Sequence, residues 1–239
     1  MEGDPPPLIF DAPLLLVGGA PCAPGVHAAA RALTGAAVCA DGGADRWEAA
    51  GHGPPDAVIG DMDSLRDPPR WRALLGPRFV HLAEQTSTDL EKCLRLTRAP
   101  LTLGVGFLGA RLDHTLAALH ALMRAAPRPV VLLGDEDAVA LIPPDWRMAV
   151  PRGARVSLFP LASVRVSACA GFEWPAAGLR FRPGARIGTS NRAAADQVRI
   201  VSDAPGMIAL TEARLAPQMI ASVLRVGAGA WPARDDCPD

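Results

Sequence analysis

Short apolar runs of strand length alternate with segments of helical spacing through the first 145 residues of the chain. The runs are PLLLVGG at 13–19, AAVCA at 36–40, AVIG at 57–60, RFVHL at 78–82, LTLGVGF at 101–107 and VVLLG at 130–134. Between them, GVHAAARAL, ADRWEAAG, TDLEKCLRL and LDHTLAALHALM are predicted helices. Strands that alternate with helices form a mainly parallel sheet, so we predict a doubly wound α/β domain over residues 1–145.

Two of the predicted helices carry further signals. Thr88, followed three residues later by Glu91, forms a capping-box pattern, which predicts that a helix begins at Asp89. In the last segment the large apolar residues fall along one helical face: Leu112, Leu116, Leu119 and Met123.

The pattern changes after residue 145. Segments such as ARVSLFPL, VRVSAC, LRFRPG, QVRIVSD and GMIALTE are short, β-branched or alternating, and are separated by Gly, Pro and Asp. A helix is expected only near the end, in PQMIASVLRV. We therefore predict an antiparallel β-sandwich or barrel over residues 146–227, followed by a poorly ordered tail at 228–239.

Composition excludes several classes of protein. The net charge is −1 with no block of Lys or Arg, and aromatic residues are 5% with no Tyr, which argues against nucleic acid and anionic membranes as partners. No apolar segment reaches the roughly 18 residues of a membrane helix. The N-terminus is acidic and proline-rich, unlike a secretory signal. The five cysteines include no C-x-x-C pair, which favours free thiols in a cytoplasmic protein.

Acidic residues follow the predicted strands repeatedly. Asp41 follows 36–40, Asp61 and Asp63 follow 57–60, Asp89 follows 78–82, and Asp113 follows 101–107. Because parallel strands end at one edge of a sheet, these four loops are expected to meet there. Carboxylate oxygens are ligands of Mg²⁺, which is commonly held together with substrate phosphates. The sequence therefore predicts a metal site at this edge.

Each acid also has a simpler interpretation. Asp41 before two glycines could be a turn residue, a lone D-x-D is usually a surface loop, and Asp89 or Asp113 could be a favourable charge in the first turn of a helix. Lys92 could be a surface charge, and His114 and His120 could be packed or solvated. The coincidence of four loops favours the metal site.

Glycines follow the first two strands, at Gly18 and Gly19 and at Gly42 and Gly43, where they would allow a phosphate to approach the backbone. No P-loop pattern is present. With Lys92 and Arg111 nearby, the site would offer cations and donors to a polyphosphate.

Several motifs together resemble the thiamine pyrophosphokinase family. They are ADGGADRW, IGDMDSL, QTSTDLEKCL, GARLDHTLAALH, GFEWP and GTSNR, which occur in this order between about residues 14 and 212. The resemblance implies a two-domain homodimer that transfers a diphosphate group from ATP to thiamine, giving thiamine diphosphate and AMP.

The resemblance also implies roles for individual residues. Asp61, Asp63 and Asp89 would hold Mg²⁺, and the catalytic set would further include Asp41, Lys92, Arg111 and Asp113. ATP and its phosphates would be bound by Gly42, Gly43, Gln85, Thr88, Lys92, Arg111 and His114. Thiamine would be bound by Trp174, Ser190 and Asn191 where two subunits meet. Asp41 and Asp113 are alternative acceptors for the hydroxyl proton.

Some features depart from the family or allow other functions. Thr86 stands where the family often has an acid, and Met62 where Phe is frequent. Trp174 could be a core residue, although its indole face would suit the cationic ring of thiamine, and Asn191 could bond a pyrimidine edge. A D-x-D also occurs in metal-dependent glycosyltransferases, and a non-catalytic thiamine or nucleotide sensor is a further alternative.

Overall fold

The computed structural model describes residues 4–225, which form two compact units. The first comprises the chain up to Ala125 together with Leu132–Asp135, and the second comprises Ala126–Val131 and the chain from Glu136. The division therefore falls about ten residues before the expected boundary at 145. The physical reason is that β9 (Asp137–Ile142) pairs antiparallel with β15 (Met207–Glu212) of the second unit.

The first unit contains a parallel sheet, as predicted. Its hydrogen-bonded order is β7-β2-β3-β4-β5. The strands are β2 (Leu14–Val17), β3 (Ala36–Ala40), β4 (Ala57–Gly60), β5 (Phe79–His81) and β7 (Thr102–Val105), while β8 (Val130–Leu133) is divided between the units. The central strands are buried along their whole length, which explains their continuous apolar sequences.

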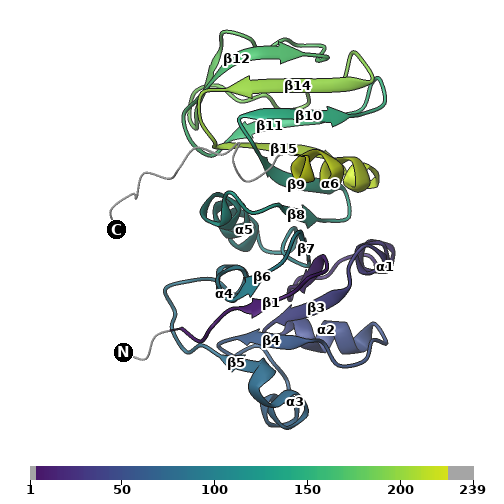
Figure 1. The fold of residues 1–239 in the computed structure, drawn as a ribbon, viewed down its shortest axis with the longest axis vertical. Helices are drawn as coiled ribbons and strands as arrows, with labels where there is room; N and C mark the ends of the chain where they lie inside the picture. The colour runs from purple at the N-terminus through teal and green to yellow at the C-terminus, as the bar shows by residue number, and fades with distance from the viewer. Residues whose placement is uncertain (1–3, 226–239) are drawn as a thin grey trace. The chain divides into compact units, whose positions relative to one another are not determined.

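Helices cover both faces of this sheet (Figure 1). They are α1 (Pro24–Ala32), α2 (Gly43–Ala49), α3 (Pro68–Leu75), α4 (Asp89–Leu96) and α5 (Leu112–Ala125), with the 3₁₀ turn η1 (Gly76–Arg78) after α3. A short parallel pair joins β1 (Leu8–Ile9) to β6 (Thr97–Arg98). Figure 1 shows α4 and α5 on the face opposite α1 and α2, which is the doubly wound arrangement predicted from the sequence.

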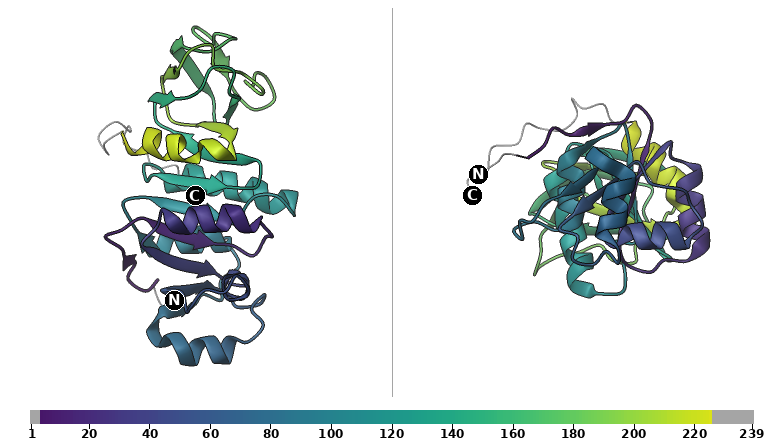
Figure 2. Two further views of the ribbon diagram at one scale, coloured as in Figure 1. Left: turned by 90° about the vertical axis from the view of Figure 1, so that its right-hand side faces the viewer. Right: turned by 90° about the horizontal axis from the view of Figure 1, so that it is seen from below.

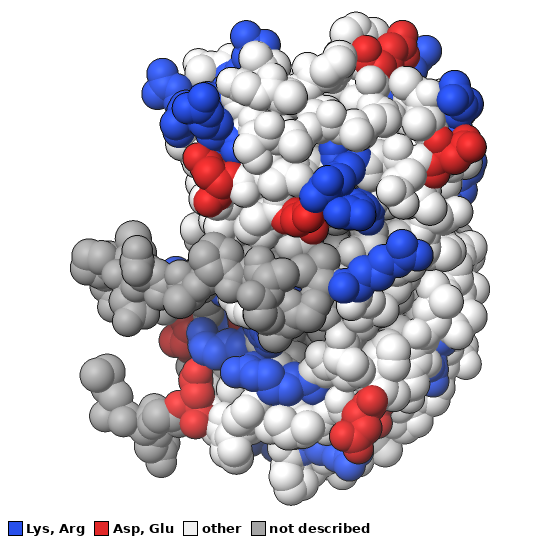
Figure 3. Space-filling view, turned by 45° about the horizontal axis from the view of Figure 1, so that its top comes forward, with Lys and Arg blue, Asp and Glu red and all other residues white. Residues whose placement is uncertain are grey.

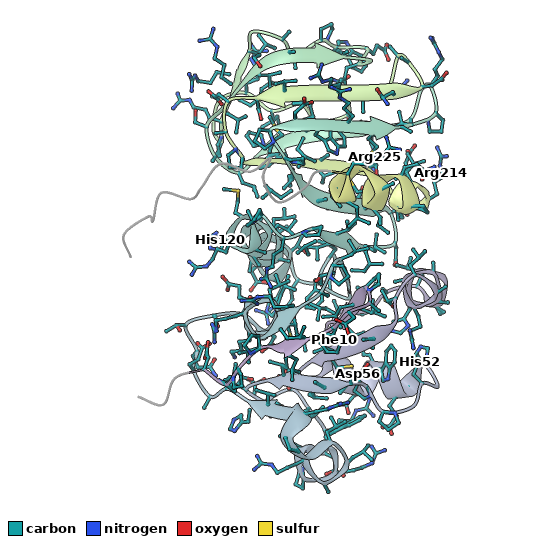
Figure 4. The ribbon with its side chains drawn as sticks, viewed as in Figure 1. Phe10, His52, Asp56, His120, Arg214 and Arg225 are labelled. Carbon is teal, nitrogen blue, oxygen red and sulfur yellow. The ribbon has the colours of Figure 1, made fainter. Side chains whose placement is uncertain are left out.

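Helix α5 buries a different face from the predicted apolar one. Leu112 and Leu116 are exposed, while the buried residues are Ala118, Ala121, Leu122 and Ala125. The buried face thus carries mainly small side chains, and α5 packs against α4. His114 and His120 are also exposed, and Figure 4 shows His120 on the outer side of α5.

The second unit is antiparallel, as predicted. Strands β11, β15 and β9 are hydrogen-bonded in that order, and a four-stranded sheet has the order β10-β14-β12-β13. Its remaining elements are β10 (Asp145–Ala149), β11 (Val156–Pro160), β12 (Val164–Ala170), β13 (Arg180–Phe181), β14 (Gln197–Ser202), the turn η2 (Ala213–Leu215) and α6 (Ala216–Leu224). Strand β10 alternates strictly between buried and exposed residues, so its buried side chains face a core.

Helix α6 packs against β9 and β10 (Figures 1 and 2). Trp146 of β10 donates its indole N–H to Ser222 Oγ of this helix at 2.8 Å, which satisfies a buried polar group. The predicted tail at 228–239 lies outside the described residues. Among the described helices, none has the length and apolar character required to cross a bilayer.

Candidate active site

Three carboxylates from separate loops converge in the first unit. Asp41 follows β3, Asp61 follows β4, and Asp89 is the first residue of α4 after β5. One oxygen from each lies within 4.8 Å of the others. Within residues 4–225, no other group of three acidic, His or Cys residues is this close. The parallel sheet brings them together because its strands end at one edge.

The backbone around Asp41 is closely constrained. Its φ is 45°, a left-handed conformation that Asp tolerates better than most residues. Its backbone N–H donates to Ile59 O at 3.0 Å, and Ser64 N–H donates to Asp41 Oδ2 at 3.1 Å. A Cβ at Gly60 would lie 2.8 Å from the Asp41 Cβ, so a glycine is required there. The carboxylate is therefore held in one place by its neighbours.

Lys92 is buried beside the other two acids. Its Nζ lies 3.2 Å from Asp61 Oδ2 and 3.5 Å from Asp89 Oδ1, and the side chain is 1% exposed. Gln85 Nε2 donates to the same Asp61 oxygen at 2.8 Å. Lys92 is the only lysine in a chain that otherwise uses arginine, a signal that sequence reasoning overlooked. A compact ammonium fits this position, whereas a planar guanidinium is larger and presents its donors as a fork.

Burial raises the pKa of Asp41 from its ordinary 3.8 to about 7. The Ser64 N–H opposes this change in pKa, and the nearby carboxylates of Asp89, Asp63 and Asp61 add to it. Asp41 Oδ1 is buried and accepts no hydrogen bond. An uncompensated carboxylate of this kind holds its proton unless a cation arrives.

The pKa values of the other two acids move in opposite directions. Burial raises the pKa of Asp89, and the Lys92 ammonium only partly opposes it. Burial also acts to raise the pKa of Asp61, but the hydrogen bonds from Gln85 and Lys92 outweigh it and leave that pKa lowered. Asp89 Oδ1 is 3.5 Å from the Lys92 ammonium nitrogen, whereas Asp61 Oδ2 is 3.2 Å from it. The lysine thus compensates Asp61 best and leaves a net negative charge on the cluster.

Glu84 organises the loop that carries Gln85. Its carboxylate accepts hydrogen bonds from Thr86 N–H at 2.8 Å and Oγ1 at 2.7 Å, and from Ser87 N–H at 3.1 Å and Oγ. Arg95 Nη2 of α4 also donates to it, at 3.0 Å. The sequence analysis missed Glu84, whose hydroxyl partners Thr86 and Ser87 lie two and three residues further along the chain.

The same loop leads into α4 through the predicted capping box, which is confirmed. Thr88 Oγ1 accepts from Glu91 N–H, and Glu91 Oε2 accepts from Thr88 N–H. Asp89 is therefore fixed at the first position of the helix, where its side chain joins the cluster. Thr88 uses its hydroxyl in this cap.

Asp63 does not belong to the three-residue group, in which Asp41 takes the third position. The residue between the two acids, Met62, is buried with a φ of 68°, and Asp63 is exposed. Asp63 Oδ1 accepts from Ser64 Oγ at 2.9 Å. The carboxylate remains near enough to raise the pKa of Asp41. It therefore lies beside the group.

Arg111 and Asp113 are paired with each other. Arg111 Nε and Nη2 donate to the two Asp113 oxygens at 3.1 and 2.6 Å, and both side chains are exposed. The guanidinium lowers the pKa of the Asp113 carboxyl, which stays ionised. Neither contacts the acidic cluster in the structure. On the face in Figure 3, basic and acidic side chains are interspersed.

Gly42 and Gly43 have packing reasons for their identity. A Cβ at Gly43 would lie 2.1 Å from Val17 O, and one at Gly42 would lie 3.0 Å from Ser64 O. The close approach of α2 to β2 therefore requires Gly43 whether or not a phosphate binds there.

The three predicted thiamine residues lie in the second unit. Trp174 is 55% exposed, so it is not a core residue. Asn191 is buried, donates its amide to Trp174 O at 2.8 Å and accepts from Trp174 N–H at 3.2 Å. Ser190 has a φ of 61°, and its N–H donates to Ser157 Oγ at 2.9 Å. The structure thus brings Trp174 and Asn191 into contact through the backbone.

The acidic cluster fits a hard divalent cation. All three members offer carboxylate oxygen, and one buried oxygen on Asp41 and one on Asp89 accept no hydrogen bond. The Asp89 oxygen already has the Lys92 ammonium at 3.5 Å, so Asp41 Oδ1 is the oxygen that lacks a partner. Buried polar atoms normally have partners, so this oxygen, among three carboxylates, marks a place for a positive ligand.

Sequence comparison relates the chain to known proteins. Residues 32–137 match the family model described as thiamin pyrophosphokinase, catalytic domain. Thiamine pyrophosphokinase 1 of Oryza sativa subsp. japonica is 30% identical over 197 residues, which cover 70% of this chain and 75% of the relative. Thiamine pyrophosphokinase 1 of Arabidopsis thaliana is 28% identical over 197 residues, which cover 70% and 74%.

The fold is also similar to a solved structure. The crystal structure of yeast thiamin pyrophosphokinase aligns with a TM-score of 0.70 at 16% identity, covering 92% of this chain and 94% of the yeast chain. This likeness concerns the fold.

Proposed function

This chain belongs to the thiamine pyrophosphokinase family, and we propose that Asp41, Asp61 and Asp89 form the centre at which it transfers a diphosphate group from ATP to the hydroxyl of thiamine. The products are thiamine diphosphate and AMP. Family membership makes the chain a thiamine diphosphokinase, so the proposal concerns the residues, the metal and the assembly.

The observation that carries the proposal is the unsatisfied negative charge of the cluster. Three carboxylates share one location, one buried ammonium lies beside two of them, and the buried Asp41 Oδ1 accepts no hydrogen bond. Such an arrangement is costly without a cation. A protein that must hold Mg²⁺ and a polyphosphate has a use for it.

We assign the metal to Asp41, Asp61 and Asp89, with Asp63 beside them. Bound Mg²⁺ would neutralise charge on the phosphate oxygens of ATP. Lys92 and Gln85 fix the orientation of the Asp61 carboxylate. Glu84 holds the loop of Gln85, so this part of the site is ordered before substrate binds.

Arg111 is proposed to bind phosphate oxygen. It is exposed and already fixed by Asp113, so its remaining donors can face a ligand without losing that pair. Gly42, Gly43, Thr88 and His114 remain proposed neighbours of ATP. Because the Thr88 hydroxyl is engaged in the helix cap, its contribution would be to place Asp89.

The hydroxyl proton of thiamine must pass to a base during the transfer. Asp113 is a weak acceptor because Arg111 lowers its pKa. Asp41 has the greater affinity for a proton when no cation is bound, because burial raises its pKa to about 7. A metal ion competes with that proton, so we propose Asp41 as the acceptor where it is free of the metal and Asp113 as the alternative acceptor.

Trp174 is proposed to bind the cationic ring system of thiamine. Its indole is exposed, and an aromatic face attracts a cation by about 1 kcal/mol. Ser190 is proposed to contribute next to it. The family resemblance further implies a homodimer with the site at the subunit interface, which we include in the proposal. The free-thiol pattern of the cysteines supports a cytoplasmic enzyme.

Labelled ATP tests the reaction itself. With thiamine and Mg²⁺, label in the α-phosphate should appear only in AMP, and label in the γ-phosphate should appear only in thiamine diphosphate. Labelled ADP would indicate transfer of a single phosphoryl group and would contradict the proposal. Binding of thiamine without any product would indicate a sensor.

A further inference from the structure

We propose that Asn191 is a positioning residue that fixes the Trp174 indole for thiamine and does not itself contact thiamine. This inference rests on the proposed function, because it assumes that Trp174 binds the substrate. It assigns Asn191 a different role from the direct pyrimidine contact that its residue type suggests.

The hydrogen-bonding capacity of Asn191 is almost fully used by the backbone. Its Oδ1 accepts from Trp174 N–H at 3.2 Å and from Arg192 N–H at 2.8 Å, and its Nδ2 donates to Trp174 O at 2.8 Å. A carboxamide oxygen accepts two hydrogen bonds, so no acceptor capacity remains. The residue is 6% exposed. It cannot therefore both donate to and accept from a pyrimidine edge.

These bonds act on Trp174 specifically. The Asn191 side chain binds both the N–H and the C=O of Trp174, which fixes the peptide units on either side of that residue. The preceding residue is tied to the same segment, because Glu173 N–H donates to Arg192 O at 2.9 Å. The Trp174 backbone is thus held while its indole stays 55% exposed.

Asn191 is in turn anchored to a strand. Its C=O accepts from Val156 N–H of β11 at 2.8 Å, and Ser157 Oγ of the same strand accepts from Ser190 N–H at 2.9 Å. The left-handed φ of Ser190, 61°, turns the chain between these two attachments. The position of Trp174 is therefore set by β11 through Asn191.

Fixing an exposed aromatic side chain has a functional benefit. A large apolar side chain at the surface loses hydration only when a ligand covers it, and binding is weaker if its loop must first become ordered. A backbone clamp removes that ordering cost. Loss of the clamp should therefore weaken thiamine binding and leave ATP binding unchanged.

A double-mutant cycle tests the coupling. Asn191→Ala, Trp174→Ala and the double variant are compared for the KM of thiamine and the KM of ATP. We expect each single change to raise the thiamine KM about tenfold, equivalent to 1.4 kcal/mol, and the double variant to match Trp174→Ala. The ATP KM should stay constant throughout.

The outcomes distinguish a failure of the inference about Asn191 from a failure of the proposed thiamine site at Trp174. If Trp174→Ala raises the thiamine KM and Asn191→Ala adds its full effect on top, Asn191 binds thiamine directly and the inference is overturned. If Trp174→Ala leaves the thiamine KM unchanged, the proposed thiamine site is wrong, and the inference with it.

A spectroscopic measurement tests the clamp on Trp174 without relying on the kinetics of Asn191→Ala. In protein labelled with 5-fluorotryptophan, the Trp174 signal is identified by its loss in Trp174→Phe. Asn191→Ala should change the shift or width of that signal while the signals of the buried Trp47, Trp71 and Trp146 stay in place. An unchanged Trp174 signal would overturn the clamp, and changes in all signals would show a general structural role, which also overturns it.

Discussion

The Lys92 ammonium nitrogen lies 3.2 Å from Oδ2 of Asp61, and the lysine side chain is 1% exposed. A buried charge pair of this kind is maintained only while both partners are present. The pair sits among further acids, so Lys92 supplies the only buried positive charge of the described cluster before a cation binds. This relationship leads to the first prediction.

Replacing Lys92 with Met should destabilise the metal-free protein strongly. The change leaves Asp61 and Asp89 without their cation, and breaking a buried pair in this way costs about 3–5 kcal/mol. Mg²⁺ should restore part of the loss, because it supplies positive charge at the same place. Urea denaturation with EDTA and with Mg²⁺ measures both effects. An unchanged midpoint in EDTA would show that the ammonium is not needed.

Asp41 should make the metal-free protein less stable as pH rises. Its folded pKa of about 7 lies above its ordinary 3.8, so between these values the folded state binds a proton that the unfolded state has released. The free energy of unfolding contributed by this group therefore falls as pH rises through that window. Asp41→Asn should remove this slope and match or exceed the wild-type stability at pH 8. If the free energy of unfolding of the two proteins depends on pH with the same slope in EDTA, the raised pKa is not that of Asp41.

A proton and Mg²⁺ should compete for the Asp41 carboxylate. Because Mg²⁺ needs the ionised Asp41 carboxylate, its affinity should rise with pH up to about 7, with release of a proton on binding. Calorimetric titration in buffers of different ionisation enthalpy measures the proton released. Binding with no proton release at pH 6 would count against Asp41 as a ligand.

Glu84 should stabilise the folded protein at neutral pH, and this stabilisation should be lost in acid. Hydrogen bonds from Ser87, Thr86 and Arg95 hold the pKa of its carboxyl well below the ordinary 4.5. A lowered folded pKa contributes stability above the ordinary value that is lost as pH falls below it. Glu84→Gln should therefore lower the free energy of unfolding at pH 7. The free energy of unfolding of this variant should also depend less steeply on pH in the acid range, which we call the acid limb. Glu136→Gln, at an exposed glutamate, is the control and should leave that limb unchanged.

The sequence predicted the framework of the site better than its details. The strands that end before Asp41 and Asp61 were located because buried parallel strands have continuous apolar sequences, and the start of α4 because Thr88 and Glu91 form a capping box. The structure gathers Asp41 with Asp61 and Asp89, whereas Asp63, which follows Met62 with its left-handed backbone, is exposed beside this group. A non-glycine residue gives no local signal for that conformation.

Two other differences have similar causes. The apolar spacing of α5 permits more than one buried face, and the face that is buried in the structure carries Ala118, Ala121, Leu122 and Ala125. Asn191 is predicted to bind thiamine because its type suits a pyrimidine, and in the structure its amide also bonds the backbone of Trp174, 17 residues away in the sequence. Such a contact is visible only in the folded chain.

Subunit mixing tests the proposed assembly. Asp61→Asn and Trp174→Ala variants are each expected to be weakly active, and free exchange should yield about half mixed dimers with one intact site of two. Activity should then rise towards a quarter of the wild-type total, measured as AMP formed at low thiamine concentration. Demonstrated exchange with no rise in activity would place both residues in a site formed by one subunit.

The most direct test of the acidic cluster is the rate of thiamine diphosphate formation by Asp61→Asn, with Asp196→Asn as a control at an exposed aspartate of the second unit. Both substitutions remove one negative charge by the same chemical change. With ATP, thiamine and saturating Mg²⁺, wild type and Asp196→Asn should form thiamine diphosphate and AMP at equal rates, and Asp61→Asn should be slower by more than about tenfold, a barrier increase above roughly 1.4 kcal/mol. If Asp61→Asn keeps more than about a tenth of the wild-type rate, the catalytic cation is not held at this cluster.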